Sequence, residues 1–144
     1  MISYIFSKSE MFVILSLMNI SLPDIEQFCT VSYDSIQDRK ILDSLEKKMF
    51  VKLKKDRSVS ISPVIWFLFR QMECSEKYIQ FDKNNCLVYC CGDFFISVSK
   101  DEFNDKNIIL TPLKDKIQLK EMMTEKNMTY FTIKEINKKE ELWF

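Results

Sequence analysis

The stretch YIQFDKNNCLVYCCGDFFISV, residues 78–98, decides the fold because its apolar side chains recur mainly at alternate positions. A period of two is typical of strands, and the stretch is interrupted twice by turn-forming residues, at 82–85 and at Gly92-Asp93. The three strands that it predicts are residues 78–81, 86–91 and 94–98. Strands joined by such short turns pair as antiparallel hairpins.

The chain after this stretch continues the same pattern. Residues 107–113 predict a fourth strand, in which Pro112 is tolerable near a strand end or at an edge. A helix is expected at residues 115–126 and a further strand at 128–133, whereas the tail 135–144 favours neither. This half is therefore predicted to be an antiparallel β-meander packed by one or two helices.

The chain before residue 75 has mainly helical patterns. Ser7-Lys8-Ser9-Glu10 has the form of a capping box and opens the apolar run 11–18, which ends near Asn19 before the break at Leu22-Pro23. A helical turn is plausible at residues 24–29. A second full helix is expected at residues 34–49, with an apolar stripe made by Ile41, Leu42, Leu45 and Met49.

A short hairpin and a third helix follow. Residues 50–53 and 58–61 alternate apolar and polar side chains around a charged turn. Ser62-Pro63 is a good helix start, and the helix to about residue 72 carries Ile65, Phe69 and Met72 on one stripe, widened by Trp66, Phe67 and Leu68. Helix, helix, hairpin, helix is a winged-helix-like order. The prediction is an α+β fold in one domain, 1–144, with a mainly helical part (1–75) and a sheet part (76–144).

The composition argues against catalysis. The 144 residues are 47% hydrophobic, carry 21 basic and 21 acidic side chains, and include no His and one Gly. Without His, the usual general base and the commonest metal ligand are missing, and a single Gly cannot build a phosphate-binding loop. The prediction is a non-enzymatic protein with no catalytic residues, no cofactor and no metal.

The cysteines favour a reducing compartment. The five are Cys29, Cys74, Cys86, Cys90 and Cys91, an odd number without a CxxC pair. Cys86 and Cys90 would share one strand face and Cys91 the other, which leaves too few ligands for a metal and favours buried cysteines. No apolar run spans a bilayer and no signal peptide is recognisable, so a cytoplasmic protein without membrane insertion is expected.

Two surfaces are candidates for binding. The aromatic-rich strands exceed the needs of a sheet covered on one face, so a protein partner or a second copy would cover Tyr89, Phe94, Phe95 and Val98. The alternative interpretation is that these side chains pack against the flanking helices.

The second candidate is the basic hairpin, with Lys52, Lys54, Lys55 and Arg57. In a winged-helix transcription regulator these side chains would contact DNA phosphates. The preceding helix carries several acidic residues and the net charge is zero, which disfavours nucleic acid and favours a solvated hairpin.

An order of features across residues 7–98 resembles the EspG-like, type VII (ESX) secretion-associated proteins. The features are SEMFVIL (9–15), the Leu22-Pro23 break, SLEKKMFV (44–51) before the hairpin, ISPV (61–64) and the strands from Tyr78. The resemblance implies a cytosolic chaperone or adaptor that binds a small helical secreted protein. Longer members of the family look like two such halves and this chain holds one, so a homodimer would supply the second half.

Overall fold

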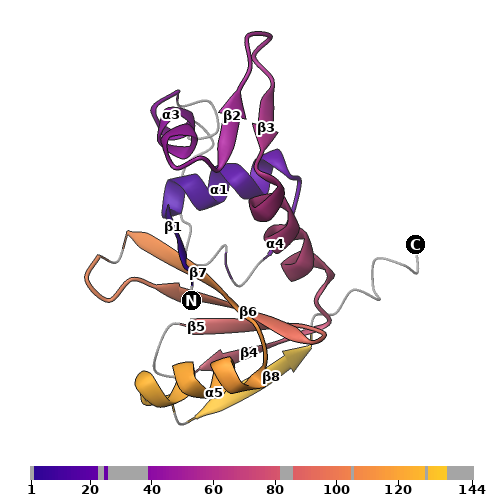
Figure 1. Cartoon of the computed structure of the whole chain (residues 1–144), viewed down its shortest axis with the longest axis vertical. Coiled ribbons are helices and arrows are strands. Elements are labelled where there is room, and N and C mark those ends of the chain that lie inside the picture. Colours follow the sequence, from indigo (N-terminus) through magenta and orange to yellow (C-terminus); the bar gives the residue numbers. More distant parts are fainter. Residues whose placement is uncertain are drawn as a thin grey trace.

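The computed structural model describes residues 2–22, 25, 39–81, 86–104, 106–128 and 130–135. The elements in chain order are β1 (Tyr4–Ser7), α1 (Lys8–Leu17), α3 (Arg39–Lys47), β2 (Val51–Leu53), β3 (Val59–Ile61), α4 (Pro63–Cys74), β4 (Lys77–Phe81), β5 (Cys86–Cys91), β6 (Phe94–Lys100), β7 (Asn107–Leu113), α5 (Lys116–Glu125) and β8 (Phe131–Glu135). Figure 1 shows the hairpin β2–β3 pointing away from a sheet at the opposite end of the molecule. The predicted α+β class is confirmed.

The sheet has six strands in the order β1-β7-β6-β5-β4-β8, and each described pair of neighbours is antiparallel. The predicted meander is present as β4 to β7, and Gly92, at φ 79°, forms the turn between β5 and β6. Two strands extend it. β8 pairs with β4, starting three residues later than predicted. β1 pairs with β7 and was not predicted, because four residues directly before a helix are too short to show a period of two.

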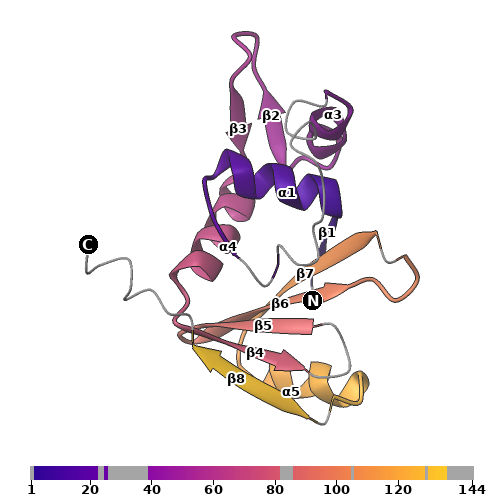
Figure 2. The same cartoon turned by 180° about the vertical axis from the view of Figure 1, so that it is seen from behind.

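Helices cover both faces of this sheet (Figures 1 and 2). On one face, Leu87 and Tyr89 of β5 share a buried cluster with side chains of α1 and α4. On the other face, Val88 of β5 shares a smaller cluster with Leu119 and Met122 of α5. Alternate residues of one strand therefore serve two cores, which explains why β5 is apolar at all its positions and not only at every second one, as a period of two would have it.

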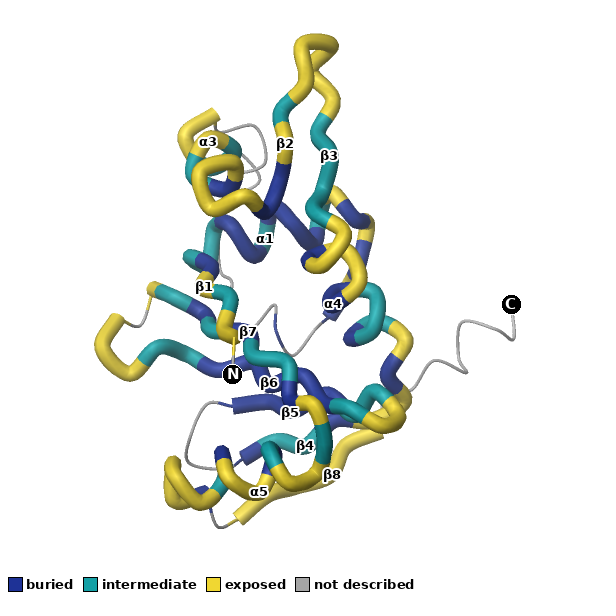
Figure 3. Tube along the Cα trace, viewed as in Figure 1, coloured by how far each residue is buried: buried dark blue, intermediate teal, exposed yellow. Residues whose placement is uncertain are grey.

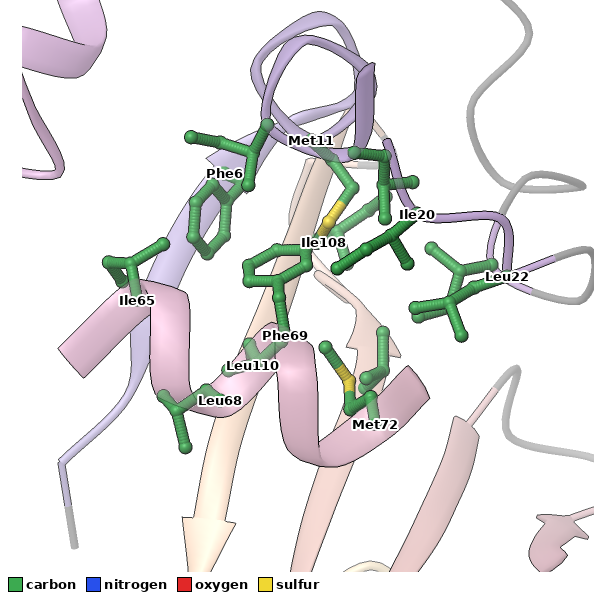
Figure 4. Close-up of a cluster of buried hydrophobic side chains, with 14 of the residues drawn as sticks. Phe6, Met11, Ile20, Leu22, Ile65, Leu68, Phe69, Met72, Ile108 and Leu110 are labelled. Atoms are coloured by element: carbon green, nitrogen blue, oxygen red, sulfur yellow. The ribbon is translucent and has the colours of Figure 1, made fainter. Parts of the chain in front are cut away.

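The larger cluster joins the helical part to the sheet part. Figure 4 shows the side chain of Phe69 pointing from α4 toward Met11 of α1, and Ile108 of β7 belongs to the same buried cluster. The ring of Phe6, in β1, lies 5.7 Å from the ring of Phe69 and 4.7 Å from that of Phe50. Residues from positions 6 to 110 thus share one core, so the two parts of the chain are packed together rather than merely linked.

Helix ends follow local sequence rules. The predicted capping box of α1 is present: Ser7 Oγ accepts from the Glu10 N–H, and Glu10 Oε1 accepts from the Ser7 N–H. α1, α3 and α5 end in Schellman motifs, whose left-handed residues are Asn19, Met49 and Asn127. In a chain with one glycine, two of these three positions go to Asn, the residue that tolerates this conformation best after Gly.

Several details of the predicted helices are corrected. Met49 does not continue the apolar stripe of α3: it lies past the helix end with 82% of its surface exposed. Leu68 is buried with the stripe of α4, but Trp66 and Phe67 are about half exposed, because they lie on the opposite side of the helix. Ser62 holds the N-cap position, yet its side chain makes no cap hydrogen bond.

The remaining predictions differ in outcome. Pro112 belongs to β7, which is not an edge strand because β1 pairs with it. This pairing ends at Leu110, so the missing N–H of Pro112 costs no hydrogen bond to β1. The helix predicted from residue 34 begins, within the described part, at Arg39. The turn at 24–29, except for the buried Ile25, and the tail from residue 136 lie outside the described residues. The order of α1, α3, β2–β3 and α4 agrees with prediction, while the winged-helix assignment stays a prediction.

Candidate functional site

The four strand residues predicted to contact a partner lie mostly inside the protein. Tyr89 and Val98 are buried in the larger cluster and Phe95 in the smaller one. Phe94 is half-buried, its ring 6.1 Å from that of Phe67. Figure 3 shows the central strands as largely buried. The chain's own helices cover these side chains, as the alternative interpretation held, so the four do not form an open face.

The basic hairpin, in contrast, is open to solvent. Lys52, Lys54, Lys55 and Arg57 are all exposed, at and near the tip that projects farthest from the sheet (Figure 3). The Arg57 N–H donates to the Lys54 carbonyl at 3.1 Å, and Arg57 takes a left-handed φ of 69°. These features are typical of a three-residue hairpin loop, which fixes the direction of the tip.

Beside the hairpin lies a groove of about 480 Å³. It is lined by Glu46, Met49, Val51, Lys52, Ser60, Ile61, Ser62 and Pro63, and we call it the hairpin groove. Met49 lies just past the end of α3, and Pro63 is the first residue of α4, so the ends of two helices meet the hairpin at this groove. Most of the lining is apolar, and the exposed Met49 and Lys52 place an apolar and a cationic group at the same opening.

Hydrogen bonds fix the walls of this groove. The Ser62 N–H donates to the Phe50 carbonyl at 2.9 Å, which ties the start of α4 to the start of the hairpin. The Leu53 N–H donates to Glu46 Oε2 at 2.8 Å, which ties the hairpin to α3. Phe50 and Val51 are buried in the larger cluster below. The groove is therefore part of the rigid core-backed structure and not a flexible loop.

The end of α3 is held by an ion pair between the buried Glu10 and the partly exposed Lys48, the residue that directly follows the helix. Lys48 Nζ lies 2.6 Å from Glu10 Oε1 and donates to the Ile5 carbonyl at 3.0 Å, while the Ser44 hydroxyl donates to Glu10 Oε2 at 2.9 Å. Burial raises the pKa of Glu10, but the bonds from Lys48, Ser7 and Ser44, with the Lys48 charge, outweigh it and leave the pKa below its ordinary value. Glu10 is therefore a carboxylate at neutral pH, and it joins α1, β1 and α3.

The charge around the groove has one predominant sign. Residues 52–57 contain four cations and a single anion, Asp56, whose pKa is lowered by hydrogen bonds from the hydroxyl and N–H of Ser58. Within the described part of the chain, no ion pair involves any of the four cations. The apolar groove thus lies beside a hairpin tip with an excess of positive charge, and such an arrangement attracts an acidic partner.

No family model, curated protein or solved structure matches this chain. A function for this chain therefore has to be inferred from its own residues and their geometry. In the described residues no helix is long and apolar enough to cross a membrane, and no three His, Cys, Asp or Glu side chains are placed to hold a metal ion.

Sequence reasoning found the hairpin cations but missed the groove. Met49 was assigned to the buried stripe because it continues the helical spacing of Leu45. A signal for its exposure was available in the sequence Lys47-Lys48-Met49-Phe50. If the helix ends before Phe50 and Phe50 turns into the core, the side chain of Met49 is left in solvent. The spacing of apolar residues along the chain does not indicate that Pro63 lines the same groove as Met49.

Proposed function

We propose that this chain is a non-catalytic adaptor or chaperone that binds an acidic, amphipathic segment of another protein in the hairpin groove. The observation that carries the proposal is the exposed Met49 at the mouth of an apolar groove, beside the cations of the hairpin. Apolar surface that is contiguous and rimmed by polar residues commonly marks a protein contact, and here Met49 continues the apolar lining of the groove.

The groove is large enough to receive a few side chains of a partner. Its volume of about 480 Å³ lies in the range of about 300–1,000 Å³ typical of binding pockets. An amphipathic helix would insert the apolar side chains of one face while its acidic residues face Lys52, Lys54 and Lys55. This is the helix-in-groove mode of recognition, with charge setting the orientation and the association rate.

The alternative function, a winged-helix transcription regulator, uses the same cations but not the groove. A DNA backbone contributes phosphates and sugars, which would leave the apolar lining of Met49 and Pro63 without a partner. The apolar lining therefore favours a protein over nucleic acid.

The resemblance to EspG-like proteins supplies one concrete class of partner. A small helical secreted protein of a type VII secretion system offers an amphipathic helix of the required kind, and a cytoplasmic chaperone would shield that helix until export. Co-purification of such a protein with the full-length chain would support this assignment.

A homodimer has its own candidate contact in β8. This strand ends the sheet order, and its five residues are all exposed, including Phe131 and Ile133. Edge strands of this kind pair with further strands. Size-exclusion chromatography with light scattering tests the dimer, and a monomer at micromolar concentration contradicts it.

The binding proposal is tested with a labelled helical peptide that has Leu on one face and Glu on the other. Fluorescence anisotropy should show saturable binding that weakens with salt, and a Lys-for-Glu version of the peptide should bind far more weakly. Met49→Gly should weaken binding roughly ten-fold, from the loss of one apolar side chain. Lys54→Gln with Lys55→Gln should mainly slow association.

The matched control is Phe103→Ser. Phe103 is 96% exposed on the loop after β6 and is not part of the groove lining, so its loss should leave peptide binding unchanged. Equal effects of the Met49 and Phe103 variants would contradict the groove. Salt-dependent binding of arbitrary duplex DNA, stronger than that of the acidic peptide and unaffected by Met49→Gly, would favour the regulator instead.

A further inference from the structure

A second cleft, of about 400 Å³, lies where α4 meets the sheet, apart from the hairpin groove. Its lining is Gln71, Cys74, Ser75, Glu76, Lys77, Cys90, Cys91 and Gly92. Three of the five cysteines of the chain therefore line one opening, although they come from a helix and a strand. None of the three forms a disulfide in this structure.

The thiol of Cys91 lies against the last turn of α4. Its Sγ is 3.4 Å from Ser75 Oγ and donates to the Gln71 carbonyl at 3.8 Å. Gln71 lies three residues before Cys74 in the sequence, and Ser75 directly follows it. The sulfur of Cys91 thus lies at the same helical turn that carries Cys74, and both cysteines line the same cleft.

The two thiols differ in access. Cys74 is exposed, so a reagent in solution reaches it directly. Cys91 is half-buried, and this burial raises the pKa of its thiol. The charges of Cys90 and Cys74 raise the pKa further, and a hydrogen bond from Ser75 lowers it by less than these raise it. Cys91 is therefore a poor first nucleophile at neutral pH and is well placed only to react with a sulfur already held at Cys74.

We propose that Cys74 is a modification site for small-molecule disulfides and that Cys91 resolves the adduct into a Cys74–Cys91 bond. In the first step the Cys74 thiolate attacks one sulfur of the reagent, its S–S bond breaks, and one thiolate leaves and takes up a proton. In the second step Cys91 loses its proton and attacks Cys74 Sγ, which expels the second thiolate. Two protein thiols are oxidised and one disulfide is reduced to two thiols.

The other described cysteines are placed differently. Cys86 is buried in the smaller cluster, and Cys90 packs against the same cluster, on the face of the sheet that α5 covers. Cys91 packs against the larger cluster, on the side of α4. Because the odd and even positions of β5 point to opposite faces, Cys91 is the strand thiol directed toward Cys74.

The test treats the folded full-length chain with oxidised glutathione, blocks the remaining thiols and measures the intact mass. The expected product has lost two hydrogen atoms and carries no glutathione. Trypsin should then release residues 71–77 joined to residues 84–100. Cys29 falls in another tryptic peptide, so it does not confuse the assignment.

Variants separate the two roles. Cys91→Ser should stop at a stable adduct with one glutathione on Cys74, Cys74→Ser should give neither the adduct nor the bond, and Cys90→Ser should behave as the parent chain. A parent chain that stops at the glutathione adduct would overturn the resolving role of Cys91. A bond that persists in Cys91→Ser and disappears in Cys90→Ser would overturn the pairing.

Discussion

Glu10 shows at the scale of a single residue how this fold is held together. It is 2% exposed, and in the described part of the chain it is the one charged residue that is buried. Both carboxylate oxygens accept hydrogen bonds, from Ser7 and Lys48 on one and from Ser44 on the other. A buried carboxylate is tolerated only with such partners, and the loss of Lys48 would leave Glu10 without its counter-charge.

We expect Glu10→Gln to lower the free energy of unfolding by about 2 kcal/mol, because the amide keeps one oxygen for the capping box but loses the charge-assisted hydrogen bonds from Lys48 and Ser44. Urea denaturation followed by circular dichroism measures the change. Glu102→Gln, on an exposed loop, is the control and should stay within about 0.5 kcal/mol of the parent. Equal effects of the two substitutions would contradict a structural role for the ion pair.

The pKa of Glu10 predicts a pH dependence. Because this pKa is lower in the folded chain than the ordinary value of 4.5, the carboxylate stabilises the fold above that pH, and its contribution is lost as the pH falls through the folded-state pKa. The stability difference between the parent and Glu10→Gln should be constant from neutral pH down to about 5 and shrink below it. Urea denaturation at several pH values measures it, and a difference that grows on acidification contradicts the assignment.

The ends of helices show at the scale of elements how one glycine suffices for this fold. α1 and α5 close with Asn at the left-handed position, but α3 closes with Met49, at φ 64°. A residue with a Cβ pays a steric cost in this conformation, which glycine avoids. The motif survives because Phe50, the next residue, is buried and its N–H donates to the Leu45 carbonyl at 3.0 Å.

Met49→Gly should therefore raise the free energy of unfolding by about 0.5–1 kcal/mol, since the exposed side chain contributes no core packing. Thermal or urea denaturation checks it. The paired control is Lys47→Gly, two residues earlier and inside α3, which should lower stability by about 1 kcal/mol. The same substitution thus has opposite signs at the two positions. A Met49→Gly variant that is more stable and also binds the peptide more weakly would indicate that the methionine serves binding rather than stability.

The two cores on opposite faces of one sheet set the behaviour of the whole molecule. The same strands supply Leu87 and Tyr89 to one cluster and Val88 to the other, so neither cluster can open without disturbing the strands that both require. Such shared elements favour one cooperative unfolding transition for the helical and sheet parts together.

Cooperativity can be tested from the far side of the sheet. Met122→Ala, in α5, should destabilise the protein by about 2–4 kcal/mol. In a Trp143→Phe background, the fluorescence of Trp66 in α4 then reports only the opposite face. The fluorescence midpoint and the far-ultraviolet circular dichroism midpoint should shift by the same amount. A shift confined to circular dichroism would show that the two parts unfold separately.

The sequence alone determined those features that depend on neighbouring residues. The capping box at Ser7, the alternation in β4 to β7, the turn at Gly92 and the Pro63 start of α4 are local in origin, because a few adjacent side chains fix the backbone there. The strand that begins the chain and the exposed side of α4 were missed for the opposite reason. β1 exists because β7 lies beside it, and Trp66 is half exposed because it lies outside the stripe of α4 that enters the core.

The candidate sites depended more strongly on the tertiary structure. The exposure of the hairpin cations could be predicted from the sequence, because charged side chains on a short turn keep their charged ends in water. The presence of Met49 and Pro63 in one groove and the meeting of Cys74 with Cys91 required elements distant in sequence to come together, and no period along the chain encodes such a meeting. Apolar spacing tells which residues leave water, whereas only the packed structure tells which apolar and thiol groups remain at its surface, since exposure depends on every neighbour at once.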